Sequence, residues 1–230
     1  MVNFFGVEMY VTILENQLEK ITDNLLDYSN ETSERITKSV ESYIKEDPVL
    51  SKDIIEGTTK INKKSEEIEY ECLKILGLQQ PVAKDLRLGA AILRTSTELE
   101  RINLLAAYIS RYSIDSLRKG SNFYKPIHIT LMSHTVQNML KDGVGSLLSG
   151  DIQLLKRSTK NFVSLQEFYN QMFSENGEDK TSNSSMHSIL VARSLLSMGH
   201  HIMGMNDRIA YSIIGKRIMH HKVFYNVLMR

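Results

Sequence analysis

Residues 11–28 read VTILENQLEKITDNLLDY, and this stretch decides the fold class. Its apolar side chains follow one another at alternating intervals of three and four positions: Val11, Leu14, Leu18, Ile21, Leu25 and Tyr28. This spacing places them on one face of an α-helix, as in a helix that packs in a bundle. The face continues to residue 44. Asp47 is expected to stop the helix, because a residue before proline avoids helical backbone angles.

The same periodicity recurs along the rest of the chain. Helical segments are predicted at about 51–76, from Pro81 to about 109, from Pro126 to about 147, at 152–173 and at 189–213. Gly77 is expected to cap the end of the second segment, and Pro81 is expected to be the first residue of the third. Asp151 is expected to cap the start of the fifth.

The chain therefore divides into two similar halves. The polar segment 115–125 is typical of a linker, and 174–185 is the most loop-like stretch. Three helices in each half, about 100 residues apart, indicate an internal duplication. The predicted fold is all-α, with two tandem three-helix bundles at residues 7–114 and 125–217 and a C-terminal extension at 218–230.

The composition supports this fold class and limits the compartment. Of 230 residues, 42% are hydrophobic and 24% charged, which argues against disorder, and 3 Pro and 12 Gly are too few for the turns of an all-β protein. The single cysteine, Cys72, fits a reducing compartment. We recognise no signal peptide and no membrane-spanning run. A cytoplasmic protein, at most peripheral on a membrane, is expected.

The charge is distributed unevenly. Residues 1–115 contain 20 acidic and 14 basic residues, and residues 116–230 contain 7 acidic and 14 basic ones. The halves thus carry −6 and +7, which could guide partners, although drift of surface charge explains it equally well. Because no Lys/Arg stripe is interleaved with aromatic residues, nucleic-acid binding is not predicted.

One segment is specific enough for comparison with a known family. Residues 72–87 read CLKILGLQQPVAKDLR, and residues 98–102 read ELERI. Both resemble the PhoU family of phosphate-uptake regulators, with signature positions at Gln79, Gln80, Pro81, Asp85, Arg87, Glu100 and Arg101. A weaker match follows in the second half, at Ala192-Arg193, Gly199, His201, Ala210-Tyr211 and Gly215.

The resemblance implies a function. A PhoU-like protein is expected to be a non-enzymatic, cytoplasmic regulator that docks on subunits of a phosphate ABC transporter and on its sensor kinase, and restrains both when phosphate is plentiful. The implied fold is the pair of three-helix bundles. Asp85 also has a simpler explanation, because the positive end of a helix dipole favours an acidic side chain in the first turn.

The resemblance further implies bound metals, but this sequence departs from the family at the ligand positions. The family pattern places Glu/Asp-x-x-x-Asp on the third helix of each repeat, and carboxylates at i and i+4 share a face and can chelate a cation. Glu100 is retained, and His200 takes one position in the second repeat. Neutral or apolar residues occupy the other positions: Thr58, Asn62, Leu104 and Leu196.

We therefore expect no metal cluster and no cofactor. Weak candidates for a residual single ion are Glu67, Glu71, Glu100 and His200. For the acids, surface exposure or pairing with Arg94 and Arg101 is the favoured explanation. The adjacent pairs 200–201 and 220–221 are both His-His, and neighbours on a helix point about 100° apart, so neither pair can hold one ion unaided.

The C-terminal stretch is a second candidate for function. Residues 216–225 read KRIMHHKVFY and mix bases with large apolar side chains, and Lys216 and Arg217 are candidates for partner contact. The stretch could bind an anionic membrane surface or a partner's groove, although packing of a helix end on the bundle is favoured. A homodimer is left open.

Two other functions are left open. One is a divergent helical adaptor that kept the fold and serves another transporter or process, as the lost acids suggest. The other is a metal-dependent helical-bundle protein, which needs carboxylate and histidine clusters that are mostly missing here. The sequence has no Walker loop, Gly-x-Ser-x-Gly elbow or Cys/His nucleophile pair, so no enzyme is predicted.

Overall fold

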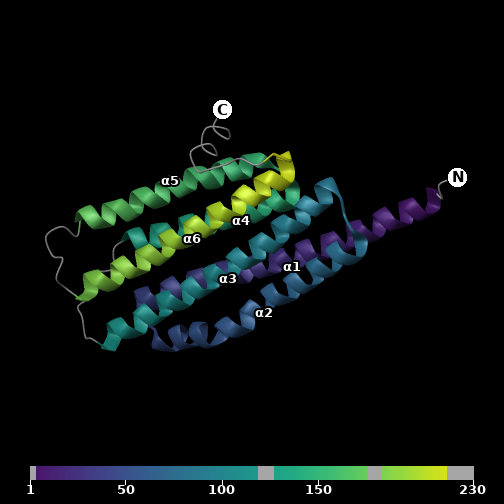
Figure 1. Ribbon diagram of the computed structural model, residues 1–230. Helices are drawn as coiled ribbons and strands as arrows, with labels where there is room; N and C mark the ends of the chain where they lie inside the picture. The colour runs from purple at the N-terminus through teal and green to yellow at the C-terminus, as the bar shows by residue number, and fades with distance from the viewer. Residues whose placement is uncertain (1–3, 119–126, 176–182, 217–230) are drawn as a thin grey trace.

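The computed structural model describes residues 4–118, 127–175 and 183–216 (Figure 1). These residues form six helices and no strand, so the all-α prediction is confirmed. The helices are α1 (Phe4–Lys45), α2 (Pro48–Gln79), α3 (Ala83–Arg118), α4 (Ile127–Ser149), α5 (Ile152–Glu175) and α6 (Asn183–Ile214). None of the helices in the described ranges is long and apolar enough to cross a membrane.

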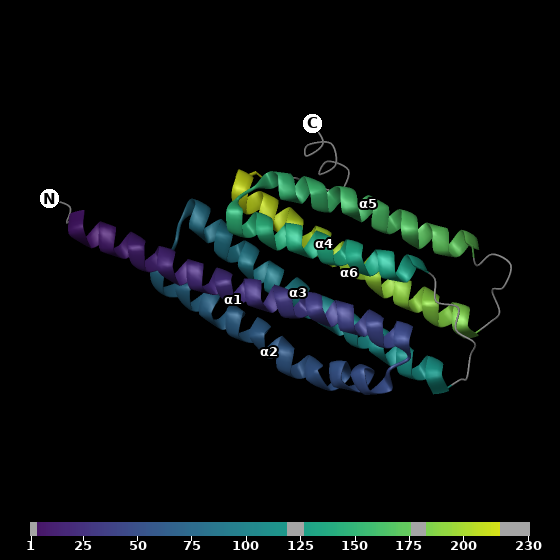
Figure 2. The same ribbon diagram turned by 180° about the vertical axis from the view of Figure 1, so that it is seen from behind.

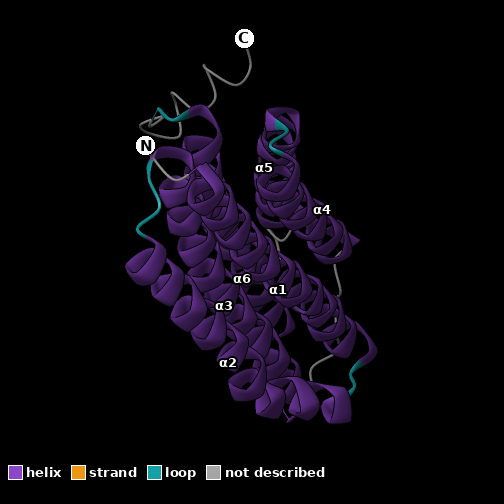
Figure 3. Ribbon diagram, turned by 90° about the vertical axis from the view of Figure 1, so that its right-hand side faces the viewer, coloured by secondary structure: helices purple, strands orange, loops and turns teal. Residues whose placement is uncertain are grey.

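Successive helices run antiparallel and pack in two groups of three (Figures 1 and 2). α1, α2 and α3 form one group, and α4, α5 and α6 form the other. The groups meet where α3 lies against α6 and α1 against α4, so that α2 and α5 lie on opposite outer sides (Figure 3). The α3–α6 contact is the most extensive between any two helices.

The apolar faces predicted from periodicity form the core. The predicted positions are buried at Leu14, Leu18, Ile21, Leu25 and Tyr28 in α1 and at Ile129, Met132, Val136, Leu140, Val144 and Leu147 in α4. Buried side chains from both groups of helices belong to one contiguous cluster. The division into domains at 7–114 and 125–217 stays a prediction, and 218–230 lies outside the described residues.

Two predicted helix boundaries in the first half are wrong, and Pro81 explains the first. α2 does not end at Gly77 but continues to Gln79, because Gln80 is the residue that precedes Pro81 and cannot remain in the right-handed helix. Gln80 adopts a left-handed conformation with φ 45°. Pro81 is not the first residue of the next helix, because α3 begins at Ala83.

Most other boundaries differ by a turn or less, but α3 extends nine residues beyond its predicted end, and α6 begins six residues before its predicted start. α2 begins at Pro48 rather than near residue 51, because Asp47 Oδ1 accepts the backbone N–H groups of Val49 and Leu50 at 2.9 and 3.0 Å. α3 includes residues 115–118 of the predicted linker, and α5 and α6 cover 174–175 and 183–185 of the predicted loop. The predicted cap at Asp151 is confirmed, because its Oδ1 accepts the N–H of Gln153 at 2.8 Å.

Candidate functional site

The signature residues lie at an exposed turn between α2 and α3. Leu78 and Val82 are 72% and 74% exposed, and Leu86 is 48% exposed, so three large apolar side chains face solvent within nine residues. Pro81 is buried beneath them. The backbone is strained on both sides of the turn, because Gln80 and Ala83 have positive φ angles of 45° and 48°.

Arg87 links this turn to the end of α6. A Cβ atom placed on Gly215 would lie 3.4 Å from Arg87 Nη2, so the guanidinium lies against this glycine. Gly215 has φ 74° and closes α6 by donating its N–H to the carbonyl of Tyr211 at 2.9 Å. The first-half signature therefore contacts the Tyr-x-x-x-Gly match of the second half.

The α2–α3 turn and the end of α6 together form one surface, which we call the signature end (residues 78–87 and 214–216). Both segments lie at the end of the molecule from which α1 begins (Figure 2). Lys84 and Lys216 are exposed there, and Ile214 is partly exposed. Lys216 thus lies beside the signature residues, whereas Arg217 is outside the described residues.

A buried carboxylate joins α3 to α6. The Glu98 side chain is 2% exposed and forms an ion pair with Arg94 one turn earlier. His201 Nδ1 of α6 donates to Glu98 Oε2 at 2.7 Å, and Arg101 lies 3.9 Å from the same oxygen. Arg101, a signature position, thus acts as a partner for a buried acid.

The environment of Glu98 favours its charged form. Burial alone would raise the pKa of this carboxyl, but the hydrogen bond from His201 and the charges of Arg94, His201 and Arg101 outweigh burial and hold the pKa below its ordinary value. Glu98 is therefore a paired, ionised group within the interface between the two helix groups.

The acidic candidates Glu67 and Glu71 lie in a groove that reaches the signature end at Leu78 and Gln79. They line this groove of about 500 Å³ between α1 and α2, together with Gln17, Asn24, Lys74 and Gln79. Lys74 lies 3.6 Å from Glu71 and supplies a counter-charge. The favoured prediction paired the candidate acids with Arg94 and Arg101, but both arginines pair with Glu98, and Glu71 pairs with Lys74 instead.

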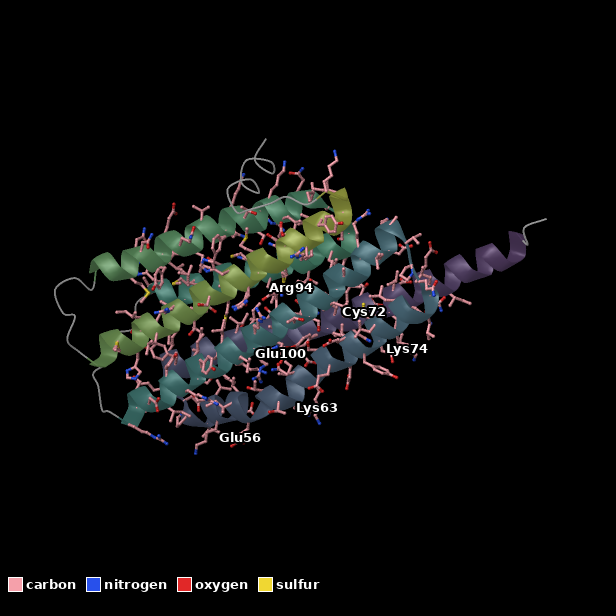
Figure 4. All side chains as sticks on the ribbon, viewed as in Figure 1. Glu56, Lys63, Cys72, Lys74, Arg94 and Glu100 are labelled. Carbon is pink, nitrogen blue, oxygen red and sulfur yellow. The ribbon has the colours of Figure 1, made fainter. Side chains whose placement is uncertain are left out.

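Glu100 faces a different group of side chains. It lies on the α2 side of α3, whereas Arg94 lies on the α6 side (Figure 4). Burial raises the pKa of Tyr28, the Asn103 hydrogen bond lowers it, and the charge of Glu100 raises it further. Tyr28 Oη in turn donates to Asn62 Oδ1 at 3.4 Å. Glu100 thus shares its surroundings with Asn62, one of the neutral positions.

Arg35 of α1 reaches the other neutral position. Its Nη2 donates to Thr58 Oγ1 at 2.8 Å and to the carbonyl oxygen of Ile54 at 2.6 Å. A fixed cation therefore lies at Thr58, one of the positions where the resemblance implies a metal-binding acid. Arg35 Nε is buried without a hydrogen-bond partner, and its N–H can only donate, so it cannot coordinate a cation. These residues do not fit a metal ion.

The second-half position has no ligand set either. Leu196 packs against the core, and His200 Nδ1 donates to the Leu196 carbonyl at 3.0 Å. The His200 ring meets Phe162 edge-to-face at 4.9 Å between centroids. Across the described residues, no three His, Cys, Asp or Glu side chains are gathered so that they could hold a metal.

A second cleft lies between α1, α4 and α5. It measures about 570 Å³ and is lined by polar side chains that include Ser29, Asn138 and Arg157. Arg157 is ion-paired with the buried carboxylate of Asp142 through two nitrogen atoms. Because this charge is already neutralised, the cleft shows no free cationic site at Arg157.

Sequence reasoning missed three of these contacts: Arg35 with Thr58, Glu98 with His201, and Arg87 with Gly215. Only one had a visible signal. Glu98 lies on the helix face of Thr95 and Ile102, where an acid must be paired if buried. For Arg35 and Arg87, residue type and spacing carried no information about the partner.

Comparison with known proteins gives a consistent result. The PhoU domain matches residues 25–113. A protein of Methanothermobacter thermautotrophicus named "Phosphate-specific transport system accessory protein PhoU homolog 2" is 55% identical, and the match covers 95% of this chain and 97% of that one. A Serratia marcescens protein named "Phosphate-specific transport system accessory protein PhoU" is 29% identical over 89% of this chain and 86% of its own length.

Two crystal structures share the fold. PhoU from Pseudomonas aeruginosa superposes with a TM-score of 0.80 and 23% identity, covering 88% of this chain and 99% of that one. The phosphate transport system regulatory protein PhoU from Streptococcus pneumoniae has a TM-score of 0.81 at 18% identity, with 89% and 99% coverage. At these identities the similarity concerns the fold.

Proposed function

The chain belongs to the PhoU family, and we propose that it regulates phosphate uptake by docking on a phosphate ABC transporter and on its sensor kinase. In this proposal it restrains both partners when phosphate is plentiful. It acts by contact and not by catalysis, on the cytoplasmic side of the membrane. The names of its relatives, accessory proteins of phosphate-specific transport, support this proposal.

The observation that carries the proposal is the exposed apolar surface at the signature end. Leu78, Val82 and Leu86 would lose contact with water on docking, and each large apolar side chain contributes about 1.5–3 kcal/mol when fully buried. Monomeric proteins rarely expose large apolar patches that have no binding role. Lys84 and Lys216 beside the patch would steer an acidic partner.

The test is capture of transporter and kinase subunits by the full-length tagged protein from cells grown at high and low phosphate. Val82→Asp places a charge in the proposed contact, and Val49→Asp is the matched control. Val49 is 76% exposed at the start of α2, at the opposite end of the molecule (Figure 1). Both substitutions fall near a helix N-terminus, where an acid is tolerated.

We expect the wild type and Val49→Asp to recover the same quantity of phosphate-transporter subunits, with more at high phosphate. Val82→Asp should recover at least fivefold less. Equal recovery by all three proteins would exclude the signature end as the docking surface. If no phosphate-transporter subunit is enriched at either phosphate level, the docking function itself is wrong.

A divergent adaptor is the second candidate, and the loss of family acids at Thr58, Asn62, Leu104 and Leu196 favours it. This candidate predicts capture of subunits from another transporter through the same surface. The capture experiment separates the two, because it identifies the subunits that are lost with Val82→Asp and kept with Val49→Asp.

A further inference from the structure

We propose that the guanidinium of Arg35 takes the place of a metal ion in the first three helices, so that this chain joins α1 to α2 with its own cation. The proposal does not depend on the docking function. It concerns the positions Thr58, Asn62, Glu100 and Leu104, at which the resemblance implies metal-binding acids.

The first argument is the geometry of Arg35. Its Nη2 spans the last part of the distance from α1 to α2 and donates to both Thr58 Oγ1 and the Ile54 carbonyl. Thr58 Oγ1 donates its own proton to the same carbonyl at 2.9 Å, and therefore has only lone pairs to offer Arg35. The neutral hydroxyl of Thr58 is thus a suitable acceptor for the Arg35 guanidinium, which can only donate.

The close approach to α2 requires a small residue there. A Cβ atom on Gly57 would lie 3.2 Å from Arg35 Nη1, which is tighter than ordinary van der Waals contact. The guanidinium therefore lies directly on the backbone of α2. Gly57 and Thr58 together form the cradle for the cation.

The second argument is the state of the remaining positions. Asn62 Oδ1 accepts from Tyr28 Oη, and Tyr28 Oη accepts from Asn103 Nδ2 at 3.4 Å. Asn103 Nδ2 also donates to Thr32 Oγ1 at 2.9 Å. Position 62 is thus part of a neutral hydrogen-bond network, and Leu104 is partly exposed and cannot coordinate an ion.

Charge repulsion completes the argument. Burial lowers the pKa of Arg35, and Asp53 and Tyr28 oppose this shift, but a guanidinium stays protonated at neutral pH. A divalent cation at the same place would meet a fixed positive charge and no carboxylate pair at i, i+4 spacing. The folding stability of the chain should therefore not depend on metal ions.

The first experiment measures urea unfolding of the full-length protein in EDTA and in excess Zn²⁺ or Mn²⁺. The wild type should have the same midpoint in all three conditions. Arg35→Met should raise the unfolding equilibrium constant at least tenfold in every condition. Lys38→Met is the matched control: it removes an exposed cation one turn later, which lies 3.5 Å from Glu34, and should change the constant less than threefold.

The second experiment restores acids with Thr58→Glu, Asn62→Asp and Leu104→Asp, with and without Arg35→Ala. Zn²⁺ affinity should be at least tenfold higher when Arg35 is absent. Equal affinity in the two backgrounds would overturn the proposal. The proposal would also be wrong if metal raised the urea midpoint of the wild type but not that of Glu100→Gln. It would be wrong as well if the purified chain held two or more metal ions, or if Arg35→Met were as stable as Lys38→Met. If Zn²⁺ binds to the variant with restored acids neither with nor without Arg35, the urea unfolding of Arg35→Met and Lys38→Met tests the proposal by itself.

Discussion

Arg87 is a signature residue with a structural role, which is to contact the end of α6. Its guanidinium lies against Gly215, where the carbonyl groups at the end of α6 carry the negative pole of the helix dipole. Gly215 is suited to this place because its φ is positive. The contact with Arg87 joins α3 to the end of α6.

A pair of glycines isolates this contact. Gly150 also has a positive φ, 71°, but a Cβ there would meet nothing within 4 Å. Gly150→Ala should cost about 1 kcal/mol for the left-handed backbone alone. Gly215→Ala should cost about the same, because a Cβ there would meet only the flexible end of the Arg87 side chain, at an ordinary contact distance of 3.4 Å. Urea unfolding measures both.

The equal cost of the two glycine variants should persist in an Arg87→Ala background, since the added methyl group does not need the guanidinium to move. A Gly215→Ala loss clearly larger than the Gly150→Ala loss, and relieved by Arg87→Ala, would show instead that Arg87 crowds this position.

Glu98 should make stability depend on acid. Its pKa in the folded protein lies below the ordinary value near 4.5, so the unfolded chain binds more protons in this range, and stability falls as pH falls through the folded pKa. The contribution is fully present above the unfolded pKa. Unfolding free energies measured from about pH 6 to pH 3 should therefore fall less steeply in Glu98→Gln than in the wild type.

The control for this pH dependence is Glu34→Gln, which removes an exposed carboxylate from a pair with Lys38. It should keep the wild-type slope. If Glu98→Gln also keeps it, the buried carboxylate is not the group whose protonation unfolds the protein.

The end of α2 could be determined by Gly77 as a cap or by Pro81 as a helix breaker, and the structure favours Pro81. Gly77 resembles a C-terminal cap, but it lies inside the helix with open space around it, and Pro81 determines the end. Gly77→Ala should therefore stabilise the protein by about 0.5–1 kcal/mol, because alanine favours a helix interior. Thermal or urea unfolding would detect the gain. A loss of similar size would mean that Gly77 is the cap after all.

Periodicity predicted the helices and their buried faces because each face depends only on residues three or four apart. It placed Leu25, Ile102 and Val136 in the core, where the structure has them. The contacts of Arg35, Glu98 and Arg87 join residues 23, 103 and 128 positions apart. Such contacts depend on which helix faces meet, and local spacing carries no information about that.

Two hydrogen bonds help to hold the two groups of helices together at their interface. Glu98 with His201, and Tyr43 Oη with Ser188 Oγ at 2.8 Å, join α3 and α1 to α6 across it. The elongated molecule that results exposes the signature end at one end (Figure 1). In the proposed docking function, its apolar side chains and Lys84 and Lys216 would face the partner together.

The charge division should therefore appear in docking. Residues 1–115 carry −6 and residues 116–230 carry +7. Lys216 of the signature end and Arg217, which follows it in the sequence, belong to the positive half. Exposed charges act through steering that salt screens over about 8–10 Å. Affinity for the transporter subunit identified by capture should fall as salt rises to physiological strength, and Lys216→Glu with Arg217→Glu should weaken it further without unfolding the helices.

Glu100→Gln is the contrasting variant, since its chelating partner position is Leu104. It should leave affinity within about twofold, because Glu100 is half-buried on the α2 side of α3, away from the signature end, and salt screens its charge over that distance. Titration of the transporter subunit with the wild type, the Lys216→Glu, Arg217→Glu double variant and Glu100→Gln, at several salt concentrations, measures these affinities. An affinity that ignores salt, or that falls strongly with Glu100→Gln while the double reversal is silent, would move the docking surface from the signature end to the face between α2 and α3.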